Sequence, residues 1–161
     1  MKKKARHILK LESKIENVNI IEKFINEICD YYHISSTYYG NILLAITEAF
    51  NNAVVHGNKL DEEKSVTISF ANTDNKITFT VIDEGKGFDF CNIPDPTDPK
   101  NENYNHTGLF IIKSLSDGIQ FCNNGNTIEI SFNLLPINQE KYQQRVAKLQ
   151  EELIKRTSNV K

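Results

Sequence analysis

The chain of 161 residues is long enough for one domain with a substantial hydrophobic core. Apolar residues make up 39% of it and charged residues 25%, which is typical of a globular protein, and no apolar stretch approaches the length of a membrane span. The net charge is −2, and since residues 1–10 contribute +5 and residues 138–161 contribute +3, residues 11–137 carry −10. Such an acidic body argues against nucleic acid as the main ligand, and the basic ends are interpreted as solvated.

The basic start of the chain and its cysteines favour a cytoplasmic location. Residues 1–4 carry the charge of a signal peptide, but no apolar run follows them, so secretion is not expected. Cys29, Cys91 and Cys122 are odd in number and show no zinc or redox spacing, so we expect reduced thiols.

Hydrophobic periodicity predicts an alternation of strands and helices along the whole chain. In the first half, the expected elements are a strand at 5–11, a helix capped by Asn17 or Asn19 that runs to about Tyr32, and a helix from Ser35 or Ser36 that Gly57 ends. In the second half, they are strands at 65–70 and 76–82, a long loop at 83–107, a helix at 108–116, a hairpin of 118–122 with 127–134, and a polar helix from 138 onward.

The second helix carries polar side chains that are candidates for chemistry. Glu48, Asn52 and His56 follow each other at intervals of four residues, so we expect them on one helix face. That face is either an ordinary solvated face or a ligand site. An amide oxygen is a suitable ligand for Mg²⁺, and a carboxylate one turn away can orient or deprotonate a nucleophile.

Two glycine-containing segments are the other candidates. Asp83-x-Gly85-x-Gly87 follows an apolar strand, and its glycines permit close approach of the backbone to a ligand, although an ordinary turn has the same pattern. Gly108 opens a helix whose exposed N–H groups and dipole favour a phosphate, although a plain helix start is the simpler interpretation. The chain contains neither the P-loop nor the Rossmann fingerprint.

In combination, the three motifs resemble those of the GHKL ATPase superfamily, whose ATP-binding domain is called the Bergerat fold. E-A-F-N-N-A-V-V-H-G at 48–57 resembles the N box, D-E-G-K-G-F at 83–88 the first glycine box, and T-G-L-F-I-I at 107–112 the second. The resemblance covers about residues 5–134. His56-Gly57-Asn58 and the Gly-Leu-Phe of the second box are similar to the anti-sigma-factor/serine-kinase branch.

The resemblance implies an α+β fold: a two-layer α/β sandwich of the Bergerat type, with a mixed, mostly antiparallel sheet covered on one face by helices. It implies a histidine-kinase-like ATP-binding domain at 1–136 and a helical C-terminal tail at 137–161. The tail has one apolar stripe, which favours a helix docked on its own domain over a dimer seam.

The resemblance also implies a role for each matching residue. Glu48 would be the catalytic base, and Asn52 would coordinate the Mg²⁺ that bridges the ATP phosphates. Asp83 would accept a hydrogen bond from the adenine amino group. The other expected ATP contacts are Gly85, Gly87, Phe88, His106, Thr107, Gly108, Leu109, Phe110 and Thr127.

The implied activity is that of a Mg-ATP-dependent kinase that phosphorylates a serine or threonine on a small antagonist protein and sequesters a sigma factor. A homodimer is possible, and neither nucleic acid nor membrane is expected as a direct partner. Two alternatives stay open: a non-catalytic, ATP-sensing module that binds a partner, and a histidine-kinase-like module that acts on a separate protein. The first alternative is motivated by Asn105-His106-Thr107, which stand where the family usually has further glycines or an arginine.

Overall fold

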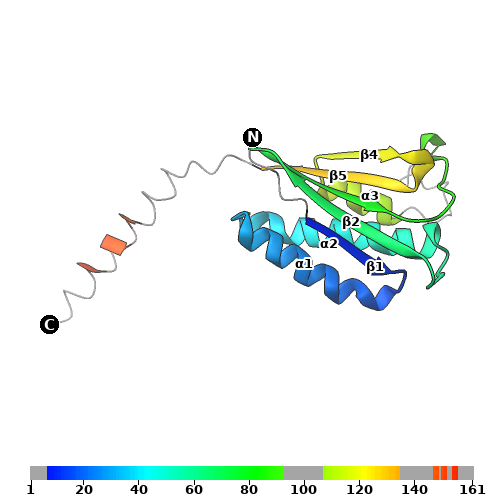
Figure 1. Cartoon of the computed structure of the whole chain (residues 1–161). Coiled ribbons are helices and arrows are strands. Elements are labelled where there is room, and N and C mark those ends of the chain that lie inside the picture. The colour runs from blue at the N-terminus through cyan, green and yellow to red at the C-terminus, as the bar shows by residue number, and fades with distance from the viewer. Residues whose placement is uncertain (1–6, 93–106, 135–146, 149, 152–153, 156–161) are drawn as a thin grey trace, which may run out of the picture.

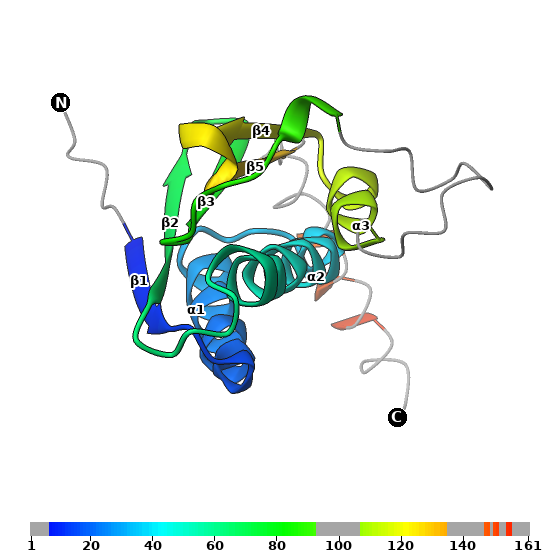
Figure 2. The ribbon, with the colours of Figure 1, turned by 90° about the vertical axis from the view of Figure 1, so that its right-hand side faces the viewer.

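The computed structural model describes residues 7–92 and 107–134, together with 147–148, 150–151 and 154–155. The two long ranges form a two-layer α/β sandwich, in which three helices cover one face of a five-stranded sheet (Figures 1 and 2). The strands and helices are β1 (His7–Glu12), α1 (Val18–Tyr31), α2 (Ser36–Asn52), β2 (Ser65–Asn72), β3 (Lys76–Ile82), α3 (Thr107–Leu115), β4 (Gly118–Cys122) and β5 (Thr127–Asn133). Short helical segments accompany them: η1 (Ile15–Asn17), η2 (Ala53–Gly57), η3 (Phe90–Asn92) and η5 (Asn123–Gly125).

The sheet has the strand order β1-β2-β3-β5-β4, and all four pairings are antiparallel. The predicted sandwich with a mostly antiparallel sheet is therefore confirmed. Side chains alternate along each strand, so that β2 and β3 bury one set of residues under the helices and turn threonine and serine to the other face. The buried set in these two strands is Val66, Ile68, Phe70, Ile77, Phe79 and Val81.

The helices cover this apolar face with their own apolar stripes. Ile21, Ile25 and Ile28 of α1 are at most 1% exposed, as are Ile42 and Phe50 of α2. Full burial of each such side chain contributes about 1.5–3 kcal/mol. Because α2 lies between α1 and α3, its two flanks contact helices and its central face contacts the sheet (Figure 2).

The starts of the two long helices differ from each other. Ser35 caps α2 as expected, since its hydroxyl accepts a hydrogen bond from the N–H of Thr37 at 3.3 Å. For α1, the predicted Asn17 occupies the N-cap position, but its side chain accepts no hydrogen bond from the helix backbone. Asn17 already has helical backbone angles at the end of η1, so its amide cannot fold back and instead donates to the carbonyl of Glu12 at 2.9 Å. Asn19 lies inside α1.

The second helix ends at Gly57 as predicted, but its last turn has a different geometry. From Ala53 to Gly57 it is a π-helix, and the N–H of Asn58 donates to the carbonyl of Ala53 at 2.7 Å. Gly57 does not terminate it through a left-handed conformation, because Lys59 and Leu60 are the residues with positive φ. A side chain at this position would instead overlap the carboxylate of Asp83, which lies in the candidate site.

The long loop after β3 and the C-terminal tail are described only in part. The loop after β3 contains η3, and its residues 93–106 lie outside the described part of the chain. Most of the expected tail also lies outside it, although the tail residues that are described are helical. Among the described helices, none combines the length and the apolar character that crossing a bilayer requires.

Candidate active site

A cavity of about 280 Å³ lies between α2, α3 and one end of the sheet. Each of the three sequence motifs contributes to its wall. Asn52 and His56 come from the α2–η2 segment, Asp83 and Phe88 from the first glycine box, and Leu109 from α3. The motifs are far apart in the chain, so the fold itself brings these predicted residues together.

Asp83, directly after β3, lines this cavity and is held in place by hydrogen bonds. Its N–H donates to the carbonyl of Asn126 at 2.9 Å, and its Oδ1 accepts a hydrogen bond from the N–H of Gly85 at 2.7 Å. Burial raises the pKa of the Asp83 carboxyl, and the Gly85 hydrogen bond opposes this effect only in part. A Cβ on Gly57 would overlap the Asp83 carboxylate, and one on Gly85 would overlap the Gly57 carbonyl. Gly57 is therefore needed for this close approach.

Glu48 and Asn52 converge on the start of α3. A Cβ built on Gly108 would lie 3.1 Å from Oε2 of Glu48 and 3.1 Å from both side-chain polar atoms of Asn52. Because Gly108 has no side chain, a small polar space remains between Gly108 of α3 and the side chains of Glu48 and Asn52 of α2. We call this space the cradle. Glu48 does not line the cavity itself, whereas Asn52 lines it and also faces the cradle.

The first glycine loop interlocks with the turn before β5. Gly87 has a φ of 79° and Gly125 a φ of 92°, values that favour glycine. A Cβ on Gly87 would overlap the carbonyl of Asn124, and one on Gly125 would lie 2.6 Å from the carbonyl of Phe88. The N–H of Phe88 also donates to the Asn124 carbonyl at 3.0 Å. The loop wall of the cavity is therefore held by backbone contacts.

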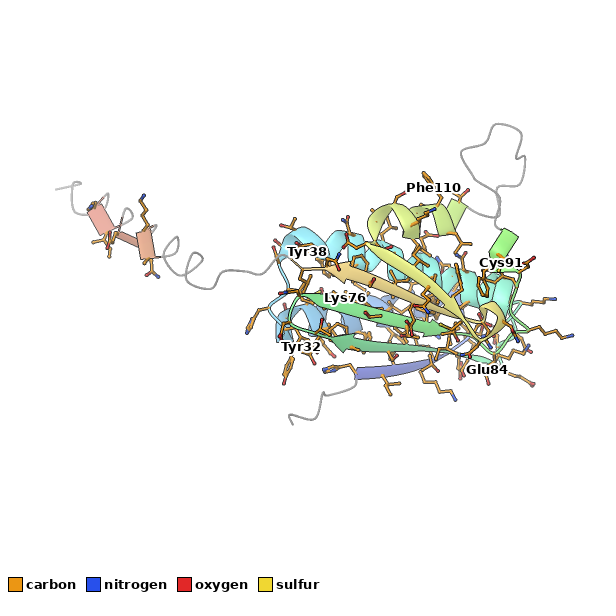
Figure 3. All side chains as sticks on the ribbon, turned by 90° about the horizontal axis from the view of Figure 1, so that it is seen from above. Tyr32, Tyr38, Lys76, Glu84, Cys91 and Phe110 are labelled. Carbon is orange, nitrogen blue, oxygen red and sulfur yellow. The ribbon has the colours of Figure 1, made fainter. Side chains whose placement is uncertain are left out.

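The other predicted site residues are placed in different ways. The hydroxyl of Thr127, 4% exposed, donates to Asn126 at 3.0 Å and accepts from Asn123 at 3.2 Å, so it braces the turn rather than lining the cavity. Thr107 begins α3, and the side chain of Phe110 is 42% exposed and outside the cavity wall (Figure 3). His106 lies outside the described residues.

Sequence reasoning missed residues that only the sheet register brings to the cavity. Phe121 of β4 lines it and packs edge-on against Phe88, with ring centroids 5.2 Å apart. Phe90 stacks on Phe121 at 5.4 Å and also lies 6.4 Å from Phe88, so the three rings form one cluster. Asn126 lines the cavity and anchors Asp83 through its carbonyl. No local motif marks these residues, since their place depends on which strands pair.

Comparison with known proteins gives the same assignment as the motifs. Residues 11–132 match the model of the histidine kinase-like ATPase domain. The serine-protein kinase RsbW of Bacillus subtilis (strain 168) is 27% identical over 133 residues, which cover 76% of this chain and 82% of the relative. RsbW of Staphylococcus epidermidis is 30% identical over 115 residues, which cover 55% of this chain and 72% of the relative.

A solved structure has the same fold. The crystal structure of the RsbU and RsbW domains of Rv1364c from Mycobacterium tuberculosis superposes with a TM-score of 0.56 at 17% identity and covers 80% of this chain. The chain spans only 32% of that longer protein. On the sequence matches and on the convergence of its three motifs, the chain belongs to the histidine kinase-like ATPase family, in the anti-sigma-factor/serine-kinase branch of the GHKL superfamily.

Proposed function

We propose that this chain is a cytoplasmic, Mg-ATP-dependent protein kinase that phosphorylates a serine or threonine on a small antagonist protein and sequesters a sigma factor. The observation that carries the proposal is the meeting of Asp83, Asn52 and the start of α3 around one cavity, with Glu48 beside it. We assign the ATP-binding domain to residues 1–136 and a separate tail to 137–161.

The residues present fit a nucleotide with Mg²⁺. The cradle beside Gly108 has an amide and a carboxylate, which are hard oxygen donors of the kind that Mg²⁺ prefers. Among the described residues no cluster of three His, Cys, Asp or Glu side chains forms a metal site. Asn52 would hold the ion together with ATP phosphates, because Mg²⁺ commonly binds through substrate phosphates and one or two protein ligands.

The proposed chemistry is in-line phosphoryl transfer, in which the protein supplies positioning and charge stabilisation. Asp83 accepts a hydrogen bond from the adenine amino group at one end of the cavity. Glu48 orients the hydroxyl of the acceptor and receives its proton. The backbone N–H groups in the first turn of α3 bind phosphate oxygens. When bound, Mg²⁺ neutralises charge on the phosphates that these groups hold.

Calorimetry tests the nucleotide site directly. ATP is titrated into the wild-type chain and into Asp83→Asn, with and without Mg²⁺. We expect Mg-dependent binding to the wild type and binding at least about tenfold weaker to Asp83→Asn, because a hydrogen bond to a charged acceptor contributes roughly 1.5–3 kcal/mol. Binding that ignores the Asp83 substitution would contradict the proposal.

Radiolabelled ATP tests the transfer step. Incubation with a candidate antagonist protein should yield phosphate that is stable in acid, as expected of phosphoserine. Glu48→Gln should bind ATP and lose transfer by about 100-fold or more, the usual range for a general base. Acid-labile phosphate would instead favour the histidine-kinase-like alternative.

A non-catalytic, ATP-sensing module is the second candidate, and the composition of the expected lid favours it. Residues 89–107 contain no arginine, so the γ-phosphate has fewer fixed positive charges than the family usually supplies. This candidate predicts that Glu48→Gln leaves nucleotide-dependent binding of the partner unchanged. Transfer of phosphate by the wild type would exclude it.

We also propose that the chain forms a homodimer through β1. This strand pairs only with β2 among the described strands, so its other edge is free for a second copy. Ile8 on this strand is 59% exposed, and Tyr31 of the neighbouring helix is 68% exposed. These two apolar side chains border a groove between β1 and α1 that a second copy can cover.

A further inference from the structure

Asn58, the residue that follows η2, is a buried amide that ties three segments of the chain together. It is 0% exposed. Its Nδ2 donates to the carbonyl of Ser65 at 3.0 Å and to the hydroxyl of Ser13 at 3.2 Å, and its Oδ1 accepts from the N–H of Glu84 at 2.8 Å. A buried amide destabilises a fold unless it is hydrogen-bonded, and here both ends of the amide have partners.

Glu84, the second residue of the first glycine box, is held from two sides by this arrangement. Its N–H is bound by Asn58, and its carboxylate accepts hydrogen bonds from the N–H and the hydroxyl of Ser65. These bonds from Ser65 lower the pKa of the Glu84 carboxyl. Glu84 is exposed and does not line the cavity; it lies at the end of the sheet opposite Tyr32 (Figure 3). Its function is therefore to fix the backbone of the loop.

Asp83 is consequently fixed on both sides. The carbonyl of Asn126 holds its own N–H, and Asn58 holds the N–H of the next residue. Gly57 precedes Asn58 and packs directly on the Asp83 carboxylate. Asn58 is thus linked to Asp83 by two routes: through Gly57, which packs on the carboxylate, and through Glu84, which follows Asp83 in the chain.

We infer that Asn58 is a positioning residue. By restraining Asp83, it gives the site its preference for adenine, which has a 6-amino group, over bases that have a 6-oxo group. The inference rests on the proposed ATP site. A carboxylate accepts a hydrogen bond from a 6-amino group but repels a 6-oxo group, and hydrogen bonds weaken steeply with poor geometry. Discrimination through a polar contact is large only when the protein group is held in place. Asn58 supplies that restraint from outside the cavity wall.

Competition binding of ATP and inosine triphosphate tests the inference. The variants are Asn58→Ala, which removes the restraint on Glu84, and Ser13→Ala, which removes only the bond on the far side of the amide. Ser13 is 1% exposed, so both substitutions affect a buried polar group. We expect the wild-type preference for ATP to fall about tenfold or more in Asn58→Ala and to stay within about twofold in Ser13→Ala.

The outcomes separate this inference from the proposed function. If the wild type fails to bind ATP, the nucleotide site is wrong and the inference with it. If the wild type prefers ATP and Asn58→Ala keeps that preference, only the inference is overturned. An equal loss of preference in both variants would indicate a general structural effect and would also overturn it.

Amide hydrogen exchange of the wild type covers the case in which Asn58→Ala does not fold. The N–H of Glu84 should exchange at least about tenfold more slowly than in an unstructured peptide, even without nucleotide, because Asn58 binds it. Exchange at the unprotected rate would show that the restraint does not exist in solution.

Discussion

At the scale of single residues, two adjacent carboxyl groups respond to their surroundings in opposite directions. Burial raises the pKa of Asp83 above its ordinary value of 3.8, whereas hydrogen bonds from Ser65 lower the pKa of Glu84 below 4.5. The native state therefore disfavours the charged form of Asp83 and favours that of Glu84. The charge that is disfavoured is the one that faces the cavity, where a ligand can compensate for it.

This difference predicts how Asp83→Asn changes stability. Between pH 3.8 and the raised native pKa, the native state holds more protons at Asp83 than the unfolded chain, so the Asp83 contribution to stability falls as the pH rises. At pH 7 the ionised carboxylate thus destabilises the fold. We expect Asp83→Asn to melt at a higher temperature than the wild type at pH 7, and the difference to shrink towards pH 4. Lower stability of the variant at pH 7 would contradict this prediction.

The three free thiols should differ in reactivity. Burial raises the pKa of the Cys29 thiol to about 11, while Cys91 is exposed and Cys122 is half-buried. Because the thiolate is the reactive form, we expect Ellman's reagent at pH 8 to modify Cys91 fastest and Cys29 only after unfolding. Mass spectrometry of peptides from the native protein checks this order. Early labelling of Cys29 would mean that α1 opens readily.

At the scale of elements, two helix glycines offer a matched comparison. A Cβ added to Gly40 in α2 would meet no atom within 4 Å. A Cβ added to Gly108 in α3 would lie 3.1 Å from side-chain atoms of Glu48 and Asn52. Gly40→Ala should stabilise the fold by about 0.5–1 kcal/mol and leave ATP binding unchanged, because alanine is the better helix former. Gly108→Ala should keep stability within about 1 kcal/mol of the wild type and weaken Mg-dependent ATP binding about tenfold, because it fills the cradle.

Thermal unfolding and calorimetry on the two variants check this prediction together. Equal binding by Gly40→Ala and Gly108→Ala would show that the cradle is not used by the ligand. A loss of binding in Gly40→Ala would show that the stiffness of α2, rather than the space at Gly108, matters for the nucleotide.

The elements were largely predictable from the sequence because periodicity reflects burial. The alternation in 76–82 and the apolar stripe at Ile21, Ile25 and Ile28 gave strand and helix correctly, since these residues are buried against each other. Asn17 was placed correctly at the N-cap of α1. The missing hydrogen bond from its side chain was not predicted, because η1 precedes the helix and no local signal marks a 3₁₀ turn. The π-helix at 53–57 was not predicted either, because no local pattern in the sequence marks it.

At the scale of the whole molecule, the site was predictable only as separate motifs. Their order along the chain indicated the family, and the family implied that Asp83 and Asn52 share one ligand. The sequence could not show that Asn126 anchors Asp83 or that Phe121 closes the wall, because both depend on the pairing of β3 with β5 and of β5 with β4. Long-range strand register leaves no short pattern in one sequence.

The proposed dimer can be tested on the exposed edge of the sheet. Ile8→Lys places a charge at a residue that is 59% exposed, so we expect its free energy of unfolding to change by less than about 0.5 kcal/mol. The same substitution should shift the chain from dimer to monomer in sedimentation velocity. Leu44→Lys, at a residue of α2 that is 46% exposed, is the matched control and should remain dimeric. An unchanged assembly in Ile8→Lys would contradict the β1 interface.

The interlock of the first glycine loop with the turn before β5 has a consequence for how relatives of this chain diverge. Gly87 excludes a side chain because of Asn124, and Gly125 excludes one because of Phe88, so each backbone occupies the space of the other's missing Cβ. A mutation at either glycine alone separates the two segments, and a second mutation cannot restore the contact while the first remains. The two positions should therefore be inherited as a pair, and lineages that lose one should have rebuilt both segments.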